Sequence, residues 1–271
     1  MFQVVPAIQR QVPGHQSGYS WATRLEARRR RQHCAGRFTM LWPFGALEKR
    51  RRAFAELFTN PNFPPSWPYT ASDFERLDES PDELFYTQPR FVTHIDDDAI
   101  AALKSFYGET LRDGTDLLDL CSSWISHLPE QYRPRQVVGL GLNDLELKKN
   151  TRLDRWVVQN LNENPVFPFA DDSFDYVTCV VSVDYLTKPL QVFREIRRVL
   201  RPGGMAIIAQ SNRCFMQKVI AIWLSTNDLE HAYIIGSYFH YAGGFENLLA
   251  RDISRGRGDP MFVVTATKQR T

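Results

Sequence analysis

The chain has only four cysteines among its 271 residues, and no CxxC pair or cluster of His and Cys occurs. Without such spacing the sequence predicts no structural zinc site and no metal in the functional site. Cysteines outside these motifs usually act as small hydrophobic residues. We therefore expect reduced thiols in an intracellular compartment.

Long hydrophobic runs are also missing. A helix needs roughly 20 apolar residues to cross a bilayer, and the longest candidate, "FMQKVIAIWLS" at residues 215–225, is too short and carries Lys218. The sequence therefore predicts no membrane span. Its 43% hydrophobic and 13% aromatic residues can still form a sizeable core, and its length fits one large domain or a domain with an appendage.

The net charge of +2 conceals an uneven distribution. Residues 1–52 hold 11 Lys and Arg against two acids, whereas residues 53–271 hold 22 basic and 29 acidic groups. Residues 1–37 lack hydrophobic periodicity, so we expect a disordered basic leader. Such leaders are typical of transit peptides, which would direct the chain to a plastid or mitochondrion rather than leave it cytoplasmic. A leader without a targeting role and a nucleic-acid-binding tail are alternatives, but the acidic body offers no phosphate-tracking stripe, so no nucleic-acid partner is expected.

Two further regions follow the leader. Residues 38–113 begin with aromatic and proline-rich sequence that is expected to wrap irregularly over the body as far as about residue 83, and they end in an amphipathic helix over about 96–111. Residues 114–271 alternate apolar strands with helical patterns. Strands are expected at 117–121, 137–142, 156–160, 175–181, 205–209, 247–253 and 261–267, and helices at 187–200, 214–224 and 227–241. This alternation predicts an α/β fold with a doubly wound, mostly parallel seven-stranded sheet and an antiparallel C-terminal hairpin.

Three segments carry a family resemblance: "VFPFADDSFDYVTCVVSVDYL" at 166–186, "VFREIRRVLRPGG" at 192–204 and "AGGFENLLARD" at 242–252. In this order and spacing they resemble the class I S-adenosylmethionine-dependent methyltransferases of type 11. More loosely, the chain is similar to a subgroup in which the glycine loop reads Ser-Ser-Trp-x-Ser-His. The resemblance implies a Rossmann-like methyltransferase domain over residues 114–271, with S-adenosyl-L-methionine as its cofactor.

The turn that would hold this cofactor contains no glycine. In a doubly wound sheet the ligand lies outside the carboxyl ends of the strands, where the strand order switches, which here is the end of the first strand. Cys121, Ser122 and Ser123 are small enough for a close approach if their φ angles stay negative. The two hydroxyls could bond the methionyl carboxylate or ammonium, and Asp119 could pin the loop or attract the ammonium. Alternatively, the serines cap a short helix between residues 122 and 136, and Trp124 either roofs the pocket or packs under the aromatic segment.

The other cofactor contacts of the family also differ here. Gly141 stands where the family usually has an acid that bonds both ribose hydroxyls, so Asn143 or Asp144 would have to reach back in its place. Asn160 stands where an aspartate commonly faces the adenine amino group, and its carbonyl oxygen can still accept that hydrogen bond. The backbone N–H of Leu161 would serve a ring nitrogen.

Three side chains are candidates for catalysis. His127, just past the loop, and Asp184 and Tyr185, after the fourth strand, are expected near the mouth of the pocket, where a general base would act on a hydroxyl or acidic carbon. A lone histidine such as His127 is more often a surface or packing residue. His94 and Tyr86 could close the pocket from the N-terminal side.

The sequence therefore predicts an S-adenosylmethionine-dependent methyltransferase with a small-molecule or lipid-like acceptor. The "N/D-P-P-Y/F" signature of amino methylation is absent, which disfavours adenine, cytosine or glutamine acceptors. A non-catalytic module that binds the cofactor is the first alternative. A nicotinamide-dependent oxidoreductase is the second, although the missing glycine fingerprint and the closing hairpin oppose it. The sequence indicates neither the acceptor nor the oligomeric state.

Overall fold

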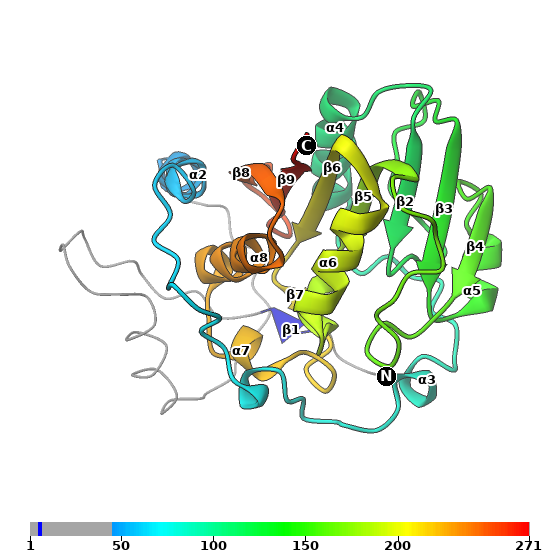
Figure 1. The fold of residues 1–271 in the computed structure, drawn as a ribbon, viewed down its shortest axis with the longest axis horizontal. Helices are drawn as coiled ribbons and strands as arrows, with labels where there is room; N and C mark the ends of the chain where they lie inside the picture. The colour runs from blue at the N-terminus through cyan, green and yellow to red at the C-terminus, as the bar shows by residue number, and fades with distance from the viewer. Residues whose placement is uncertain (1–4, 7–44, 271) are drawn as a thin grey trace.

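The structure, a computed structural model, describes residues 5–6 and 45–270 (Figure 1). The predicted basic leader, residues 1–37, lies outside the described residues except for strand β1 (Val5–Pro6), which pairs antiparallel with β7 (Arg213–Cys214). The disorder of this leader and its role as a transit peptide stay predictions.

A seven-stranded sheet in the order β4-β3-β2-β5-β6-β9-β8 forms the centre of the molecule. Its strands are β2 (Asp116–Leu120), β3 (Gln136–Gly141), β4 (Arg155–Val158), β5 (Phe174–Val180), β6 (Leu200–Gln210), β8 (Phe245–Asp252) and β9 (Phe262–Lys268). The first five pair in parallel, whereas β9 runs antiparallel to both β6 and β8. The predicted doubly wound sheet with an antiparallel hairpin is confirmed.

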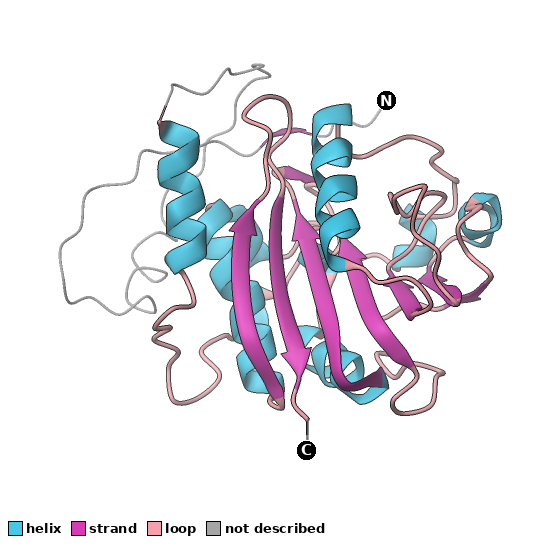
Figure 2. Ribbon diagram, turned by 90° about the horizontal axis from the view of Figure 1, so that it is seen from above, coloured by secondary structure: helices cyan, strands magenta, loops and turns pink. Residues whose placement is uncertain are grey.

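Helices cover both faces of this sheet (Figure 2). Side chains alternate between the faces along a strand, so Leu117 packs with α4 (Asp97–Thr110), and its neighbour Leu118 packs with α6 (Pro189–Val199) and α8 (Asp228–Ala242). Both leucines are fully buried. The chain builds β3 and β4 on one side of β2 and β5 and β6 on the other, so the strand order switches between β2 and β5.

The aromatic N-terminal region is more regular than its composition predicts. Residues 46–56 form a helix, α2 (Ala46–Glu56), where irregular chain was expected. The segment "ALEKRRRAFAE" has too few apolar residues to show a helical period, and it buries only Phe54, whose ring stacks on Phe262 at 4.6 Å. An ion pair of 2.5 Å between Arg50 and Asp252 adds to this contact. Tertiary packing against β8 and β9 therefore stabilises a helix that periodicity does not reveal.

Two predicted helices are absent or short. Residues 121–135, between β2 and β3, contain no helix, so the interpretation of Ser122 and Ser123 as helix caps is wrong. Pro129 and Pro134 interrupt this segment, and the serine hydroxyls bind side chains instead. Of the predicted helix 214–224 only α7 (Ala221–Leu224) forms. The remaining helical elements are α3 (Asp82–Phe85), α5 (Asp144–Lys149) and the 3-10 turns η1 (Ala71–Asp73) and η2 (Val183–Tyr185).

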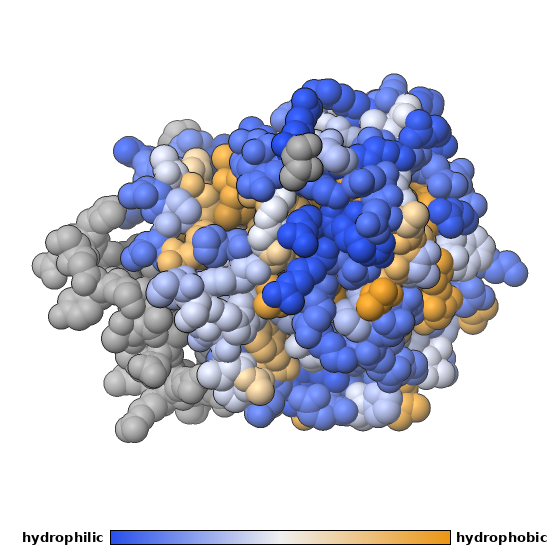
Figure 3. Space-filling view, viewed as in Figure 1, coloured by the Kyte–Doolittle hydropathy of each residue, from blue (hydrophilic) through white to orange (hydrophobic). Residues whose placement is uncertain are grey.

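The surface seen in Figure 3 is mostly hydrophilic, with its hydrophobic residues in separate groups. Within the described residues, no helix is both long enough and apolar enough to cross a membrane.

Candidate functional site

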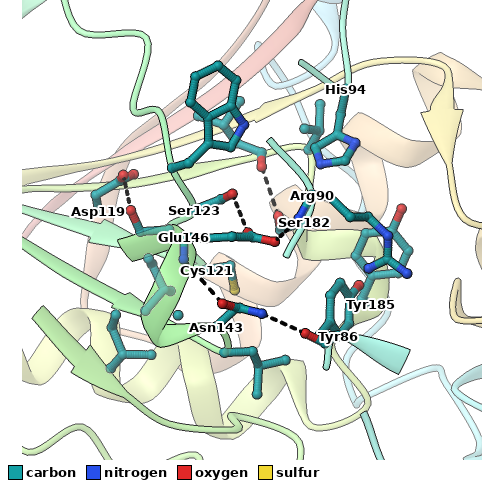
Figure 4. Close-up of a pocket in the computed structure, with 18 of the residues that line it drawn as sticks. Tyr86, Arg90, His94, Asp119, Cys121, Ser123, Asn143, Glu146, Ser182 and Tyr185 are labelled. Atoms are coloured by element: carbon teal, nitrogen blue, oxygen red, sulfur yellow. Dashed lines mark hydrogen bonds between the residues drawn. The ribbon is translucent and has the colours of Figure 1, made fainter. Parts of the chain in front are cut away.

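A pocket lies at the carboxyl ends of the central strands, where the sequence predicts the cofactor (Figure 4). All eight predicted cofactor residues line it: Asp119, Cys121, Ser122, Ser123, Gly141, Asn143, Asn160 and Leu161. The catalytic candidates His127 and Tyr185 also line it, as do Tyr86 and His94 from the N-terminal side. Asp184 is buried and does not line the pocket.

The glycine-free loop turns by placing Cys121 in the left-handed region. Its φ of 54° differs from the expected negative value. The backbone N–H of Ser122 donates to the carbonyl of Leu140 at 2.8 Å, which draws the loop back over the end of β3. Left-handed backbone costs a non-glycine residue on the order of 1 kcal/mol, so the surrounding contacts of the loop must offset that cost.

Asp119 is the anchor of the loop. Its buried carboxylate accepts hydrogen bonds from the hydroxyls of Ser122 and Ser126, both at 2.6 Å, and of Thr178 at 3.1 Å. Burial raises the pKa of Asp119, and the three hydroxyls oppose that shift. The carboxylate thus pins the loop through side chains. Because each hydroxyl has one proton and gives it to Asp119, the oxygen of Ser122 can only accept a further bond. It therefore suits the methionyl ammonium and not the methionyl carboxylate.

Glu146 is a pocket residue that the sequence analysis missed. Its Oε2 accepts from the hydroxyl of Ser123 at 2.5 Å, and its Oε1 accepts from the backbone N–H of Arg90 at 2.7 Å. The carboxylate thus joins α5 to the cofactor loop and to the N-terminal segment. A signal was available, because Glu146 stands three residues after Asn143, the position at which a glutamate often accompanies a helix cap.

Asn143 performs two structural tasks at the edge of the pocket. Its side-chain oxygen accepts from the backbone N–H groups of Leu145 and Glu146 and so caps α5. Its amide nitrogen donates to the carbonyl of Tyr86 at 2.8 Å, which holds the N-terminal segment over the pocket. Asp144 instead accepts from the indole of Trp156 at 2.8 Å and does not line the pocket. The interpretation that Asp144 reaches back toward the cofactor is therefore wrong.

Gly141 is required by the close approach of the loop. A β-carbon at this position would lie 2.1 Å from the carbonyl oxygen of Ser122 and 3.1 Å from its carbonyl carbon. Both atoms belong to backbone, so no side chain can move aside. The acid that the family usually carries here is thus incompatible with this loop.

At the end of β4, the amide of Asn160 is partly occupied by protein contacts. Its nitrogen donates to Glu83 at 2.7 Å, and its oxygen accepts from the backbone N–H of Asn162 at 3.0 Å. A carbonyl oxygen has two lone pairs, so one remains for an adenine amino group. Trp124 lines the pocket and donates its indole N–H to the carbonyl of Val92 at 3.1 Å, so it both borders the pocket and contacts the N-terminal segment.

Burial shifts the pKa of both catalytic candidates that line the pocket. Burial, with Lys104 and His94 nearby, lowers the pKa of His127 to about 4, so its imidazole is neutral at physiological pH. The hydroxyl of Tyr185 accepts from the backbone N–H of Phe215 at 2.8 Å, and burial holds its pKa well above 10. Tyr185 therefore remains a neutral hydrogen-bond donor.

Asp184 gives a prediction for stability. Burial raises its pKa to about 7, whereas a carboxyl in the unfolded chain titrates at about 4. Between these pH values the native state binds the extra proton, so stability falls as pH rises, by up to about 1.4 kcal/mol per pH unit from this group. Asp184→Asn is expected to remove that slope in urea unfolding between pH 5 and 7. The exposed Asp171→Asn is the control, and an unchanged slope in Asp184→Asn would contradict the assignment.

Metal ligands do not gather in the described part of the chain, since residues 5–6 and 45–270 contain no group of three His, Cys, Asp or Glu that could hold an ion.

The strand order, the antiparallel β9 and the pocket beside β2 together match a Rossmann-like methyltransferase fold. Residues 121–208 match the family model described as a methyltransferase domain, so this part of the chain is similar to that family. The cofactor that the family implies is S-adenosyl-L-methionine.

Curated relatives match somewhat more than a third of the chain. It is 36% identical over 103 residues to a demethylmenaquinone methyltransferase of Listeria monocytogenes serotype 4a (strain HCC23), covering 35% of this chain and 44% of that protein. It is 30% identical over 110 residues to the enzyme of the same name from Staphylococcus aureus (strain JH9), covering 38% and 46%. The chain thus spans somewhat less than half the length of these relatives.

Solved structures resemble the chain more distantly. A SAM-dependent methyltransferase from Aquifex aeolicus aligns with a TM-score of 0.46 and 16% identity, over 63% of this chain and 91% of that chain. The [4+2]-cyclase SpnF aligns with a TM-score of 0.46 and 16% identity, over 62% and 81%.

Proposed function

We propose that the protein is an S-adenosylmethionine-dependent methyltransferase that acts on a small-molecule or lipid-like acceptor. One observation carries the proposal: all eight residues predicted for the cofactor line a single pocket at the switch in strand order. Ligands of doubly wound sheets bind at this point. When bound, S-adenosylmethionine supplies an electrophilic methyl group on its sulfonium.

The residues of the chain would hold the cofactor in an unusual way. The oxygens of Ser122 and Ser123 face the pocket with their protons already given to carboxylates, so they would accept from the methionyl ammonium. Glu146 brings a carboxylate into the pocket wall from α5, which follows β3 and Gly141, the position where the family resemblance implies an acid. We propose that Glu146 takes over the binding of the ribose hydroxyls that Gly141 cannot perform.

The pocket mouth favours an apolar acceptor. Val92 lines the pocket and is 58% exposed, and the neighbouring Phe91 is 47% exposed with its ring edge-on to Trp124 at 6.4 Å. Exposed apolar side chains beside a binding cleft are typical of sites for apolar ligands. The relatives are named for demethylmenaquinone, and we propose a ring compound of comparable, lipid-like character as the acceptor.

Cofactor binding is tested directly. We expect S-adenosylmethionine and S-adenosylhomocysteine to bind with micromolar affinity in isothermal titration calorimetry, and each to raise the melting temperature because a ligand of the native state stabilises it. Folded protein that responds to neither compound would overturn the proposal. Nicotinamide dinucleotides, which the absence of a glycine fingerprint disfavours, serve as the negative control.

Catalysis is tested at His127. If its neutral imidazole removes a proton from the acceptor, His127→Ala should slow labelled-methyl transfer about 100-fold or more while cofactor affinity stays nearly unchanged. If positioning alone carries the reaction, His127→Ala should have little effect and bulky substitutions at Tyr185 should be more harmful. Tyr185→Phe, which keeps the ring and removes the hydroxyl, separates the shape of Tyr185 from its hydrogen bond.

A non-catalytic module is the second candidate function. It is favoured by Gly141, which removes the usual ribose acid, and by the hydroxyls of Ser122 and Ser123, whose protons are already engaged. The two candidates differ in one measurement. Binding of S-adenosylmethionine without labelled product, across metabolite extracts of the source cell from several growth conditions, would favour the module.

A further inference from the structure

At one end of the pocket lie aromatic side chains that are not among the predicted cofactor residues. Tyr86, Tyr185 and Phe215 line the pocket, and Phe85 packs against Tyr86 and Phe215; we call these four rings the aromatic end. Phe215 contacts two of them, with ring centroids 5.3 Å from Phe85 and 6.1 Å from Tyr185, and Phe85 lies 4.9 Å from Tyr86. Figure 4 shows Tyr86, Tyr185 and the guanidinium of Arg90 together on the right of the pocket, beyond Cys121.

The guanidinium of Arg90 is held firmly in this aromatic end. Its carbon lies 4.5 Å from the ring centroid of Phe85 and 5.3 Å from that of Phe215. Nη2 donates to the carbonyl of Phe85 at 2.9 Å. Nη1 is buried and has no hydrogen-bond partner among the described residues. A buried donor without an acceptor is costly and rare, so this nitrogen indicates a place for an acceptor atom from a bound molecule.

Among the described residues, no carboxylate pairs with the guanidinium of Arg90. One oxygen of Glu146 binds the backbone N–H of Arg90 and not its guanidinium, and the other oxygen binds Ser123. The other cations of the pocket wall have acidic partners: Arg213 binds Asp259 at 2.8 Å, and Lys218 lies 3.3 Å from Asp78. Arg90 thus brings to the pocket wall a guanidinium that no carboxylate of the described residues binds directly.

The acidic groups that act on the neighbouring His94 and Tyr86 are Glu146, Asp82 and Asp184, and within the described residues none of them forms an ion pair with Arg90. Burial lowers the pKa of His94, Glu146 opposes that shift and Arg90 adds to it, so that His94 is neutral at physiological pH. Burial raises the pKa of Tyr86 above its ordinary value of 10, so its phenol keeps its proton. In surroundings of low polarity, a cation attracts an anionic ligand more strongly than in water. The aromatic end therefore suits a flat apolar body that carries a negative charge.

We propose that the aromatic end binds an acceptor that carries a carboxylate on an aromatic ring, with Nη1 of Arg90 donating to that carboxylate. This inference rests on the proposed function, since it places the acceptor beside the cofactor in one pocket. A carboxylate is also present on the methionyl end of the cofactor. The experiment must therefore distinguish an acidic acceptor from the cofactor as the source of the carboxylate.

The acceptor arm of the test uses 2-naphthoate and its neutral amide, 2-naphthamide, as probes. Each is titrated calorimetrically into the full chain with and without saturating S-adenosylhomocysteine. We expect the wild type to bind the acid about 10-fold more tightly than the amide, because hydrogen bonds to charged groups are the stronger ones. Arg90→Gln should abolish this preference, and Arg90→Lys, which keeps the charge and loses the planar fork, should retain part of it.

The cofactor arm compares S-adenosylhomocysteine with 5′-methylthioadenosine, which lacks the amino-acid end. If Arg90→Gln weakens S-adenosylhomocysteine but not methylthioadenosine and leaves the naphthoate preference intact, the carboxylate is that of the cofactor and the inference is overturned. Equal affinity of the wild type for acid and amide would also overturn it. If the wild type does not bind S-adenosylhomocysteine, the proposed function is contradicted instead. The titration of naphthoate and naphthamide without cofactor would then still test the inference. Melting temperatures of both variants show whether they are folded.

Discussion

Gly141→Asp is expected to weaken cofactor binding strongly, although an acid is what the family resemblance implies at this position. Its β-carbon would lie 2.1 Å from the carbonyl oxygen of Ser122, which is backbone and cannot rotate away. Overpacking of this kind typically costs 1–3 kcal/mol, and here the loop that borders the cofactor must also move. We expect a lower melting temperature and an affinity for S-adenosylhomocysteine reduced about 100-fold or more.

Two further variants separate the steric effect of Gly141→Asp from the effect of its charge. Gly141→Ala adds only the β-carbon, so it should reproduce most of the loss if steric contact and not charge is the cause. Gly108→Ala, in α4, is the control. Its β-carbon would meet nothing closer than the side-chain nitrogen of Gln131 at 3.5 Å. A folded Gly141→Asp protein with equal or tighter binding would show that the loop does not close over β3 as the structure indicates.

Asp119→Ala is expected to have the second large effect. It would leave the hydroxyls of Ser122 and Ser126 without their buried acceptor, and that of Thr178 with only the carbonyl of Leu118 at 3.4 Å. Each unpaired buried donor costs about 1 kcal/mol or more, so the free energy of unfolding should fall by about 2–4 kcal/mol. Because the same bonds hold the loop, cofactor binding should be lost as well. Denaturant unfolding and calorimetric titration measure the two effects.

A mutant cycle tests whether the loss arises from these bonds. Replacing both partners of a buried hydrogen bond by apolar groups costs much less than removing one. The triple variant Asp119→Ala, Ser122→Ala, Ser126→Ala should therefore recover part of the stability that Asp119→Ala loses. A stability of Asp119→Ala within about 0.5 kcal/mol of the wild type would instead mean that the carboxylate does not anchor the loop.

The sequence by itself determined the sheet and the position of the pocket. The short apolar runs at β2, β3 and β5 alternate with helical patterns, and that alternation leads to a parallel, doubly wound sheet. Parallel strands end at one edge, so residues that follow different strands, such as Cys121 and Asn160, meet in one pocket although they are far apart in the chain.

The bonds within that pocket were decided by tertiary structure. The sequence predicts small residues in the loop, but only the hydrogen bond between Ser122 and Leu140 shows why Cys121 takes a left-handed backbone. That bond also brings the carbonyl of Ser122 against β3, which explains Gly141. Local patterns carry no information about such contacts, because they join segments on different strands.

The roles of Arg90 and Glu146 depended on the same kind of long-range contact. The N-terminal segment folds across the pocket because Asn143 binds the carbonyl of Tyr86 and Glu146 binds the backbone of Arg90. Arg90 stands in no motif that would predict this, and the helix-cap pattern that includes Glu146 does not reveal which segments its carboxylate binds. Secondary structure follows from local periodicity, which the sequence displays, whereas the partner of a buried side chain follows from packing between segments that are distant in the sequence.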